Sequence, residues 1–236
     1  MTDEIAILMA AGLGTRMSPL TNAVAKPLVK VHGCSMIETI IKGLQERGVS
    51  HIYVVVGYKK EQFDFLQIRY KNLTLVENKE YLVKNNISSI HSAAHVMKSS
   101  DCFICEADLY VSDLSIFSAR LNQSCYYGKM VKGHSDDWVF DINESGRIIR
   151  IGKCGDDVYN MVGISYFKKK DAALIADAVM EAYAHEGHEQ LYWDEIVDRK
   201  LDDIDLKIHP VNANQIVEID SVAELSVVDP EYRNYN

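Results

Sequence analysis

The glycine-rich turn that follows the first apolar segment is the feature that most constrains this chain. Residues 5–26 read IAILMAAGLGTRMSPLTNAVAK, so Gly12 and Gly14 follow a strand-like run and precede Arg16 and Lys26. Glycines let the backbone approach a phosphate closely, and the free N–H groups of such a turn can bind its oxygens. The planar guanidinium of Arg16 and the compact ammonium of Lys26 add positive charge suited to phosphate. The segment therefore predicts a triphosphate site after the first strand, and hence an enzyme that uses a nucleotide.

The sequence excludes two well-known nucleotide-binding loops. The dinucleotide fingerprint G-x-G-x-x-G needs a third glycine for close helix–strand packing, and Met17 stands at that position. The Walker motif G-x-x-x-x-G-K-[ST] occurs nowhere in the chain. What remains is G-x-G-[ST]-R followed about ten residues on by a lysine. This pattern resembles the signature of the sugar-nucleotide and MobA-like nucleotidyltransferases.

Length and charge narrow the class of protein further. At 236 residues the chain can bury a large core, and we expect one domain over residues 1–236. Its formal net charge of −9 argues against nucleic acid as a partner, because nucleic-acid-binding proteins carry basic stripes. The chain has no apolar run long enough for a membrane span, and Asp3 and Glu4 are the wrong start for a secretory signal. The odd count of five cysteines favours a reducing, cytoplasmic location.

Strand and helix patterns alternate along the first half of the chain, whereas the second half has shorter strands separated by turns. Strands joined by helices pair in parallel and are covered on both faces. We therefore expect an α/β, Rossmann-like fold: a mainly parallel mixed sheet with helices on both faces and a small antiparallel insertion at 124–167. Residues 1–123 would mainly bind the nucleotide, and residues 124–220 mainly the acceptor. Expected strands are 5–9, 51–56, 73–76, 102–105, 124–131, 138–142, 147–151, 160–167, 204–211 and 216–219; expected helices include 60–70, 88–97, 114–121 and 170–184, with capping boxes at Ser35–Glu38 and Ser221–Glu224.

Two carboxylates fall at predicted strand ends, on the same edge of the sheet as the glycine loop. Asp108 follows the strand at 102–105, and Asp220 ends the β-branched run at 216–219. Ligands of such sheets bind beyond the carboxyl ends of the strands. A triphosphate enzyme needs Mg²⁺, which takes one or two carboxylates together with phosphate oxygens. We predict Asp108 and Asp220 as metal ligands; alternatively, Asp108 is an ordinary turn residue and Asp220 a favourable charge beside a helix N-terminus.

Over nearly its whole length the chain resembles the LicC-type CTP:phosphocholine cytidylyltransferases. The segments that carry the resemblance are AAGLGTRMSPLT, VVVGYKKEQFDFL, Tyr81 with Asn85, Asn86 and Ser89, EAD at 106–108, LYWDEIV at 191–197 and EIDS at 218–221. The resemblance assigns Asp108 and Asp220 to Mg²⁺, and Arg16 and Lys26 to catalysis. The family often has aspartate where Glu106 stands. The nucleotide-binding residues that the resemblance implies are Ala10, Ala11, Gly12, Gly14, Thr15, Arg16, Lys26, Asn85, Asn86, Ser89 and Glu106.

The aromatic residues suit an acceptor that carries a quaternary ammonium. Such a group cannot donate a strong hydrogen bond, so proteins hold it over aromatic faces with a carboxylate nearby. Trp138 follows two aspartates, and Tyr192, Trp193 and Asp194 stand together, so both segments supply rings and carboxylates. We predict these four residues as acceptor-binding, although one of Tyr192 and Trp193 is expected to lie in the core.

The predicted reaction is the transfer of the cytidylyl group of CTP to phosphocholine, which yields CDP-choline and pyrophosphate. Phosphate oxygens are already nucleophilic, so positioning and charge neutralisation by Arg16, Lys26 and Mg²⁺ would carry the catalysis without a histidine base. Three other acceptors stay open: 2-aminoethylphosphonate, phosphoethanolamine and a sugar 1-phosphate. A non-catalytic nucleotide-sensing module is the alternative from another class, although it would not need the metal-binding pair.

Overall fold

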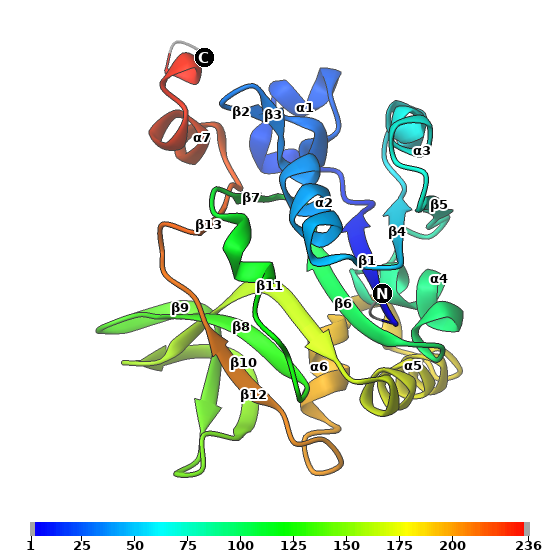
Figure 1. Cartoon of the computed structure of the whole chain (residues 1–236), viewed down its shortest axis with the longest axis vertical. Coiled ribbons are helices and arrows are strands. Elements are labelled where there is room, and N and C mark those ends of the chain that lie inside the picture. Colours follow the sequence, from blue (N-terminus) through cyan, green and yellow to red (C-terminus); the bar gives the residue numbers. More distant parts are fainter. Residues whose placement is uncertain (1–2, 234–236) are drawn as a thin grey trace.

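In the computed structural model, which describes residues 3–233, a nine-stranded mixed sheet forms the centre of the protein (Figure 1). Its strands run in the order β10-β9-β11-β6-β1-β4-β5, and β8 joins β11 to β12. The strands are β1 (Glu4–Ala10), β2 (Lys30–Val31), β3 (Cys34–Ser35), β4 (His51–Val56), β5 (Leu73–Glu77), β6 (Asp101–Glu106), β7 (Leu109–Val111), β8 (Cys125–Met130), β9 (His134–Ile142), β10 (Ile148–Asp156), β11 (Tyr159–Phe167), β12 (Lys207–Pro210) and β13 (Ile216–Glu218). The helices are α1 (Leu20–Ala23), α2 (Met36–Arg47), α3 (Asp64–Arg69), α4 (Ile87–Met97), α5 (Lys169–Tyr183), α6 (Trp193–Asp198) and α7 (Val222–Val228).

The half of the sheet formed by β6, β1, β4 and β5 is parallel and buried on both faces. Side chains of a strand alternate between the two faces, so β1 contributes to two separate cores. Leu8 packs with α2 on one face, whereas Ile7 packs with α4 and α5 on the other. The predicted fold class, a mixed α/β sheet with helices on both faces, is confirmed.

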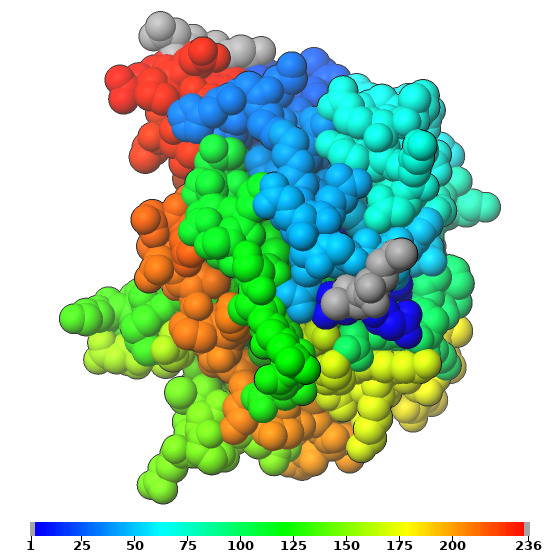
Figure 2. Space-filling model, in the orientation of Figure 1, coloured from blue at the N-terminus to red at the C-terminus, as the bar shows by residue number. Residues whose placement is uncertain are grey.

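The strands β8 to β12 of the second half extend this same sheet, whereas β13 pairs with β7 in a separate two-stranded sheet. β11 runs antiparallel to β6, and β8 and β9 in turn pair antiparallel with β11. The β9–β10 hairpin projects from the body of the protein (Figure 2). Both of its strands are longer than predicted: β9 begins at His134, and β10 runs on to Asp156, where Asp157 follows at a φ of +52°.

The predicted helix at 114–121 is wrong, since only a 3₁₀ turn, Leu114–Phe117, forms there. A helix over these residues would use the Phe117 carbonyl as the acceptor for the Leu121 N–H, whereas the Ala119 carbonyl would be among its last four, which have no partner within the helix. The guanidinium of Arg47 donates to both carbonyls, at 2.6 and 2.7 Å.

Of the two predicted capping boxes, one is formed and one is not. Ser221 accepts a hydrogen bond from the Glu224 N–H, and the Glu224 side chain accepts from the Ser221 N–H. Ser35 precedes α2, but its hydroxyl donates to the Glu38 carboxylate and not to the backbone of the helix. Glu38 also binds Arg69 and Tyr70, so this carboxylate joins α2 to α3 and does not cap α2.

A third, smaller core joins the glycine loop to the C-terminal part of the chain. Met17 is fully buried there, in contact with a cluster that includes Ile219 and Leu225. Ile219 comes directly after β13, the strand that pairs with β7. Helix α7 begins three residues after Ile219. The side chain that replaces the third glycine of a dinucleotide loop therefore anchors the loop to the segment that carries Asp220. Within residues 3–233, no helix is both long and apolar enough to cross a membrane.

We expect Met17→Ala to lower the free energy of unfolding by about 3 kcal/mol, because it leaves a cavity in this small core. The matched control is Met180→Ala on α5, whose side chain is 48% exposed and should cost about 0.5 kcal/mol or less. Urea unfolding followed by circular dichroism measures both. Equal losses for the two variants would contradict an anchoring role for Met17.

Candidate active site

The glycine loop bends tightly at Gly14, just beyond β1. Gly14 has a φ of +62°, a left-handed conformation that favours glycine, and a Cβ there would lie 2.7 Å from the Cβ of Lys26. The Thr21 hydroxyl donates to the Gly14 carbonyl at 3.0 Å and closes the loop. The loop and Lys26 therefore lie against each other, as expected for groups that bind one phosphate chain.

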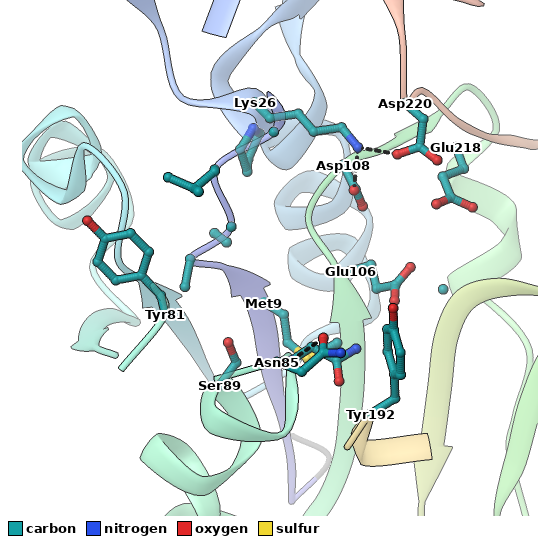
Figure 3. A pocket seen from close by; sticks show the side chains of 18 of the residues that line it. Met9, Lys26, Tyr81, Asn85, Ser89, Glu106, Asp108, Tyr192, Glu218 and Asp220 are labelled. Atoms are coloured by element: carbon teal, nitrogen blue, oxygen red, sulfur yellow. Dashed lines mark hydrogen bonds and ion pairs between the residues drawn. The ribbon is translucent and has the colours of Figure 1, made fainter. Parts of the chain in front are cut away.

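Lys26 is buried between two carboxylates that come from distant segments (Figure 3). Its Nζ lies 2.7 Å from Asp108 Oδ2 and 2.5 Å from Asp220 Oδ1. Burial lowers the pKa of Lys26, but the charges and hydrogen bonds of Asp108 and Asp220 outweigh this effect and raise it above its ordinary value. Arg16 reaches the same Asp220 oxygen at 2.9 Å from a side chain that is 72% exposed. The two predicted cations are thus held at the two predicted metal ligands.

Glu218 joins Asp108 and Asp220 in a group of three carboxylates whose oxygens lie within 4.8 Å of one another. The short β7–β13 pair brings them together, since Glu218 pairs with Leu109 and the Ile219 N–H donates to the Asp108 carbonyl. Hard oxygen donors at this spacing suit a divalent cation such as Mg²⁺. Sequence reasoning missed Glu218, although residues two apart at a strand end share a face and Glu218-Ile-Asp220 carries that signal.

Glu106, at the end of β6, lies close to these carboxylates but outside the group. Burial, with the like charge of Asp108, raises the pKa of Glu106 well above its usual range. Gly163 in β11 lets this side chain fit: it has a φ of +72°, and a Cβ there would lie 2.7 Å from Glu106 Oε2. In its protonated form Glu106 can donate a hydrogen bond, and the Tyr192 phenol points toward it in Figure 3.

Asn85 and Asn86 lie at the start of α4, and the side chains of both form hydrogen bonds within the protein. The Asn85 amide donates to the Gln190 carbonyl at 3.2 Å, and the Asn86 side chain accepts from the Trp193 N–H at 2.9 Å. Ser89 accepts from Asn78, a buried residue directly after β5 that sequence reasoning missed. Its position at a strand end was the available signal. These contacts tie the start of α4 to the segment that carries Tyr192.

Of the adjacent aromatic residues Tyr192 and Trp193, the structure brings only Tyr192 to the site. The Tyr192 ring meets Trp138 edge to face, with centroids 5.4 Å apart. Trp193 is 3% exposed and packs against Tyr126 and Phe167 in the core. Trp193 is thus the one of the pair that lies in the core, as expected for one of them, and its assignment as an acceptor-binding residue is corrected because its ring packs against the sheet.

Asp194 is buried beside this aromatic pair. Desolvation raises its pKa to about 7, although the hydrogen bond that it accepts from the Tyr126 hydroxyl at 2.8 Å favours the charged form. A carboxyl that titrates near neutral pH in a ligand cavity is typical of a functional site.

Most of these groups surround one cavity of about 700 Å³, a size suited to a nucleotide with a small acceptor. Every predicted site residue except Trp193 lines it. They are Ala10, Ala11, Gly12, Gly14, Thr15, Arg16, Lys26, Asn85, Asn86, Ser89, Glu106, Asp108, Trp138, Tyr192, Asp194 and Asp220. Tyr81 and Lys153 also line it and were not predicted as site residues.

Comparisons with known proteins agree with this geometry. A family model described as nucleotidyl transferase matches residues 5–137. The 2-aminoethylphosphonate cytidylyltransferase of Lancefieldella rimae is 56% identical over 96% of this chain and 92% of that protein. The choline-phosphate cytidylyltransferase of Streptococcus pneumoniae is 31% identical over 98% of this chain and 99% of that protein. The solved structure of the CTP:phosphocholine cytidylyltransferase of S. pneumoniae matches with a TM-score of 0.88 at 29% identity, over 98% of this chain and all of the other.

The glycine loop at the carboxyl edge of a mixed α/β sheet, with facing cations and carboxylates, defines an enzyme that acts on nucleotides. The chain belongs to the nucleotidyl transferase family. The predicted membership of the nucleotidyltransferases is therefore confirmed, and the two relatives named above, which match almost the whole chain, are cytidylyltransferases.

The raised pKa of Asp194 predicts how the stability of the protein depends on pH. Between its ordinary value of 3.8 and about 7, folded Asp194 holds a proton that the unfolded chain has released. Its contribution to stability therefore falls as the pH rises through this range. Asparagine keeps the shape and can still accept from Tyr126. We expect Asp194→Asn to gain about 1 kcal/mol or more over the wild type between about pH 5 and about pH 8.

Urea unfolding at several pH values measures this gain. Asp202→Asn, at an exposed position, serves as the control and should follow the wild-type pH profile. A difference between Asp194→Asn and wild type that stayed constant with pH would show that Asp194 keeps an ordinary pKa.

Proposed function

We propose that this chain transfers the cytidylyl group of CTP to 2-aminoethylphosphonate and releases pyrophosphate. A phosphonate oxygen attacks the α-phosphorus of CTP, and the bond from that phosphorus to the bridging oxygen of the β-phosphate breaks. The observation that carries the choice of acceptor is the 56% identity to the Lancefieldella rimae enzyme, against 31% to the phosphocholine enzyme. Of the acceptors that the sequence left open, this one is therefore better supported than phosphocholine.

The residues of the glycine loop and the two cations would bind the triphosphate. Arg16 and Lys26 now contact Asp220, and an arriving triphosphate would offer both of them oxygens of higher charge. Both groups would then offset the charge that develops on the leaving pyrophosphate. Asn85, Asn86 and Ser89, with the buried Asn78, would bind the cytosine and ribose on the α4 side of the cavity.

Asp108 and Asp220, with Glu218 beside them, would hold Mg²⁺, whose charge would polarise the phosphate oxygens. Three carboxylates fit that ion, but Lys26 lies in contact with two of them. Binding of the ion would therefore require Lys26 to move away from these carboxylates. The phosphate oxygens of CTP would then be the new partners of its ammonium.

We expect Lys26→Gln to bind Mn²⁺ about tenfold more tightly than wild type in the absence of nucleotide, because a cation at contact distance from both ligands has been removed. Asp220→Asn should bind Mn²⁺ more weakly than wild type, since it loses a charged ligand. Electron paramagnetic resonance of free Mn²⁺ measures both affinities. Asp177→Asn, on the exposed surface of α5, is the control that should leave Mn²⁺ binding unchanged. An unchanged affinity in Lys26→Gln would contradict the competition between lysine and metal.

Pyrophosphate release with a panel of acceptors tests the proposed reaction. With CTP, we expect kcat/KM for 2-aminoethylphosphonate to exceed that for phosphocholine at least about tenfold. With this acceptor, CTP should be preferred over UTP, because a site that binds one exocyclic group leaves buried polar partners unpaired with the other. A preference for phosphocholine would overturn the acceptor and leave the cytidylyl transfer. Equal use of CTP and UTP would overturn the cytidylyl transfer itself.

A further inference from the structure

Lys153 occupies the aromatic site that the acceptor was predicted to use. Its Nζ lies 5.7 Å from the centroid of the Trp138 ring and 5.9 Å from that of Tyr192. Both distances are within the range of a cation–π interaction. Two rings from different parts of the chain, one on β9 and one preceding α6, thus surround a single ammonium of the protein itself.

The backbone of β10 holds Lys153 at this position. Lys153 is directly opposite Trp138 in the β9–β10 pair, so the two side chains stand on the same face of the hairpin. The register shifts between Lys153 and Gly155, and Cys154 has a φ of +65°, which marks a bulge next to the lysine. Bulges change the direction in which neighbouring side chains point. The Arg150 guanidinium donates to the carbonyl of Cys154 at 3.2 Å and steadies the bulge.

A second, smaller cavity beside the rings can hold the ammonium of Lys153 when it leaves them. A side cavity of about 420 Å³ adjoins the main one, and Trp138, Lys153 and Tyr192 line both cavities. The side cavity is also lined by the carboxylates Glu195 and Asp198, together with Arg199. Lys153 is exposed, and a cation–π interaction at an exposed site is weak. The ammonium of a ligand can therefore replace that of Lys153 at the rings.

We propose that Lys153 is a specificity residue that selects acceptors with a primary ammonium over those with a trimethylammonium group. This inference rests on the proposed function. The ammonium of the acceptor takes the place of Lys153 at the rings, and the displaced lysine stays beside it as an added positive charge. A primary ammonium offsets that charge by hydrogen bonds to carboxylates of the cavity such as Asp137. A trimethylammonium group has no N–H to donate, and its methyl groups need the space that the lysine stem fills.

Two substitutions of Lys153 separate its charge from its packing. Lys153→Met keeps most of the length without the charge, and Lys153→Arg keeps the charge on a larger group. We expect Lys153→Met to raise the ratio of kcat/KM for phosphocholine to that for 2-aminoethylphosphonate about fivefold, through a lower KM for phosphocholine. Lys153→Arg should leave the ratio at or below the wild-type value. Lys132→Met, an exposed lysine of the β8–β9 loop, is the matched control and should not change it.

Intrinsic fluorescence supplies a readout that does not depend on turnover. The two tryptophans are Trp138 at the site and Trp193 in the core, so a ligand at the rings changes the Trp138 signal. In Lys153→Met, choline should quench this fluorescence at a concentration about fivefold lower than in wild type, with a smaller change for ethanolamine.

Three outcomes would count against the inference, and they are distinguishable. If wild type prefers 2-aminoethylphosphonate and Lys153→Met leaves both the ratio and the choline titration unchanged, the role of Lys153 is overturned while the proposed function stands. If Lys153→Met lowers kcat equally for both acceptors with KM unchanged, Lys153 supports the site in general and does not select. If wild type prefers phosphocholine, the proposed acceptor is overturned, and the inference with it.

Discussion

The contact of one buried ammonium with two carboxylates holds the charged end of the cavity together. Lys26, Asp108 and Asp220 are far apart in the sequence, and each is placed by a different element: the loop after α1, the end of β6 and the end of β13. Carboxylates this close repel one another strongly in a partly desolvated cavity, and Glu218 adds a third. Lys26 offsets this repulsion, so the acidic residues can be positioned before any ligand arrives.

The phosphate-binding end of the site could be predicted from the sequence because each of its residues is placed by the end of its own strand. A glycine turn at the end of the first strand and an acid at the end of another must meet at one edge of a parallel sheet. Gly12, Gly14 and Asp108 could therefore be assigned from strand ends alone. Met17 excluded a dinucleotide loop in the sequence, and the structure gives the physical reason, since its side chain is packed with Ile219.

The features that could not be predicted depend on contacts between distant segments. Tyr192 and Trp193 look equivalent in the sequence, and only the orientation of α6 on the sheet decides which ring is buried. The 114–121 segment has helical spacing, yet the guanidinium of Arg47 in α2 donates hydrogen bonds to two of its backbone carbonyls. Likewise, Lys153 lies over the two rings only because β10 pairs with β9 in one register. Periodicity records which face a residue occupies within its own element, and not what the fold brings opposite it.

The position of the β9–β10 hairpin at one end of the sheet order has a consequence for how such enzymes diversify. Within the sheet, β9 pairs with β11 at Phe140–Tyr159 and Val139–Asn160, and the Ile148 N–H of β10 donates to the Leu206 carbonyl. The glycine loop and the carboxylates belong to strands and turns on the far side of β11. Substitutions at the hairpin residues that face the cavity, such as Trp138 and Lys153, therefore do not touch the pairing of those strands. An ancestral chain of this architecture can exchange one acceptor for another by small steps in the hairpin, and its nucleotide chemistry is inherited unchanged.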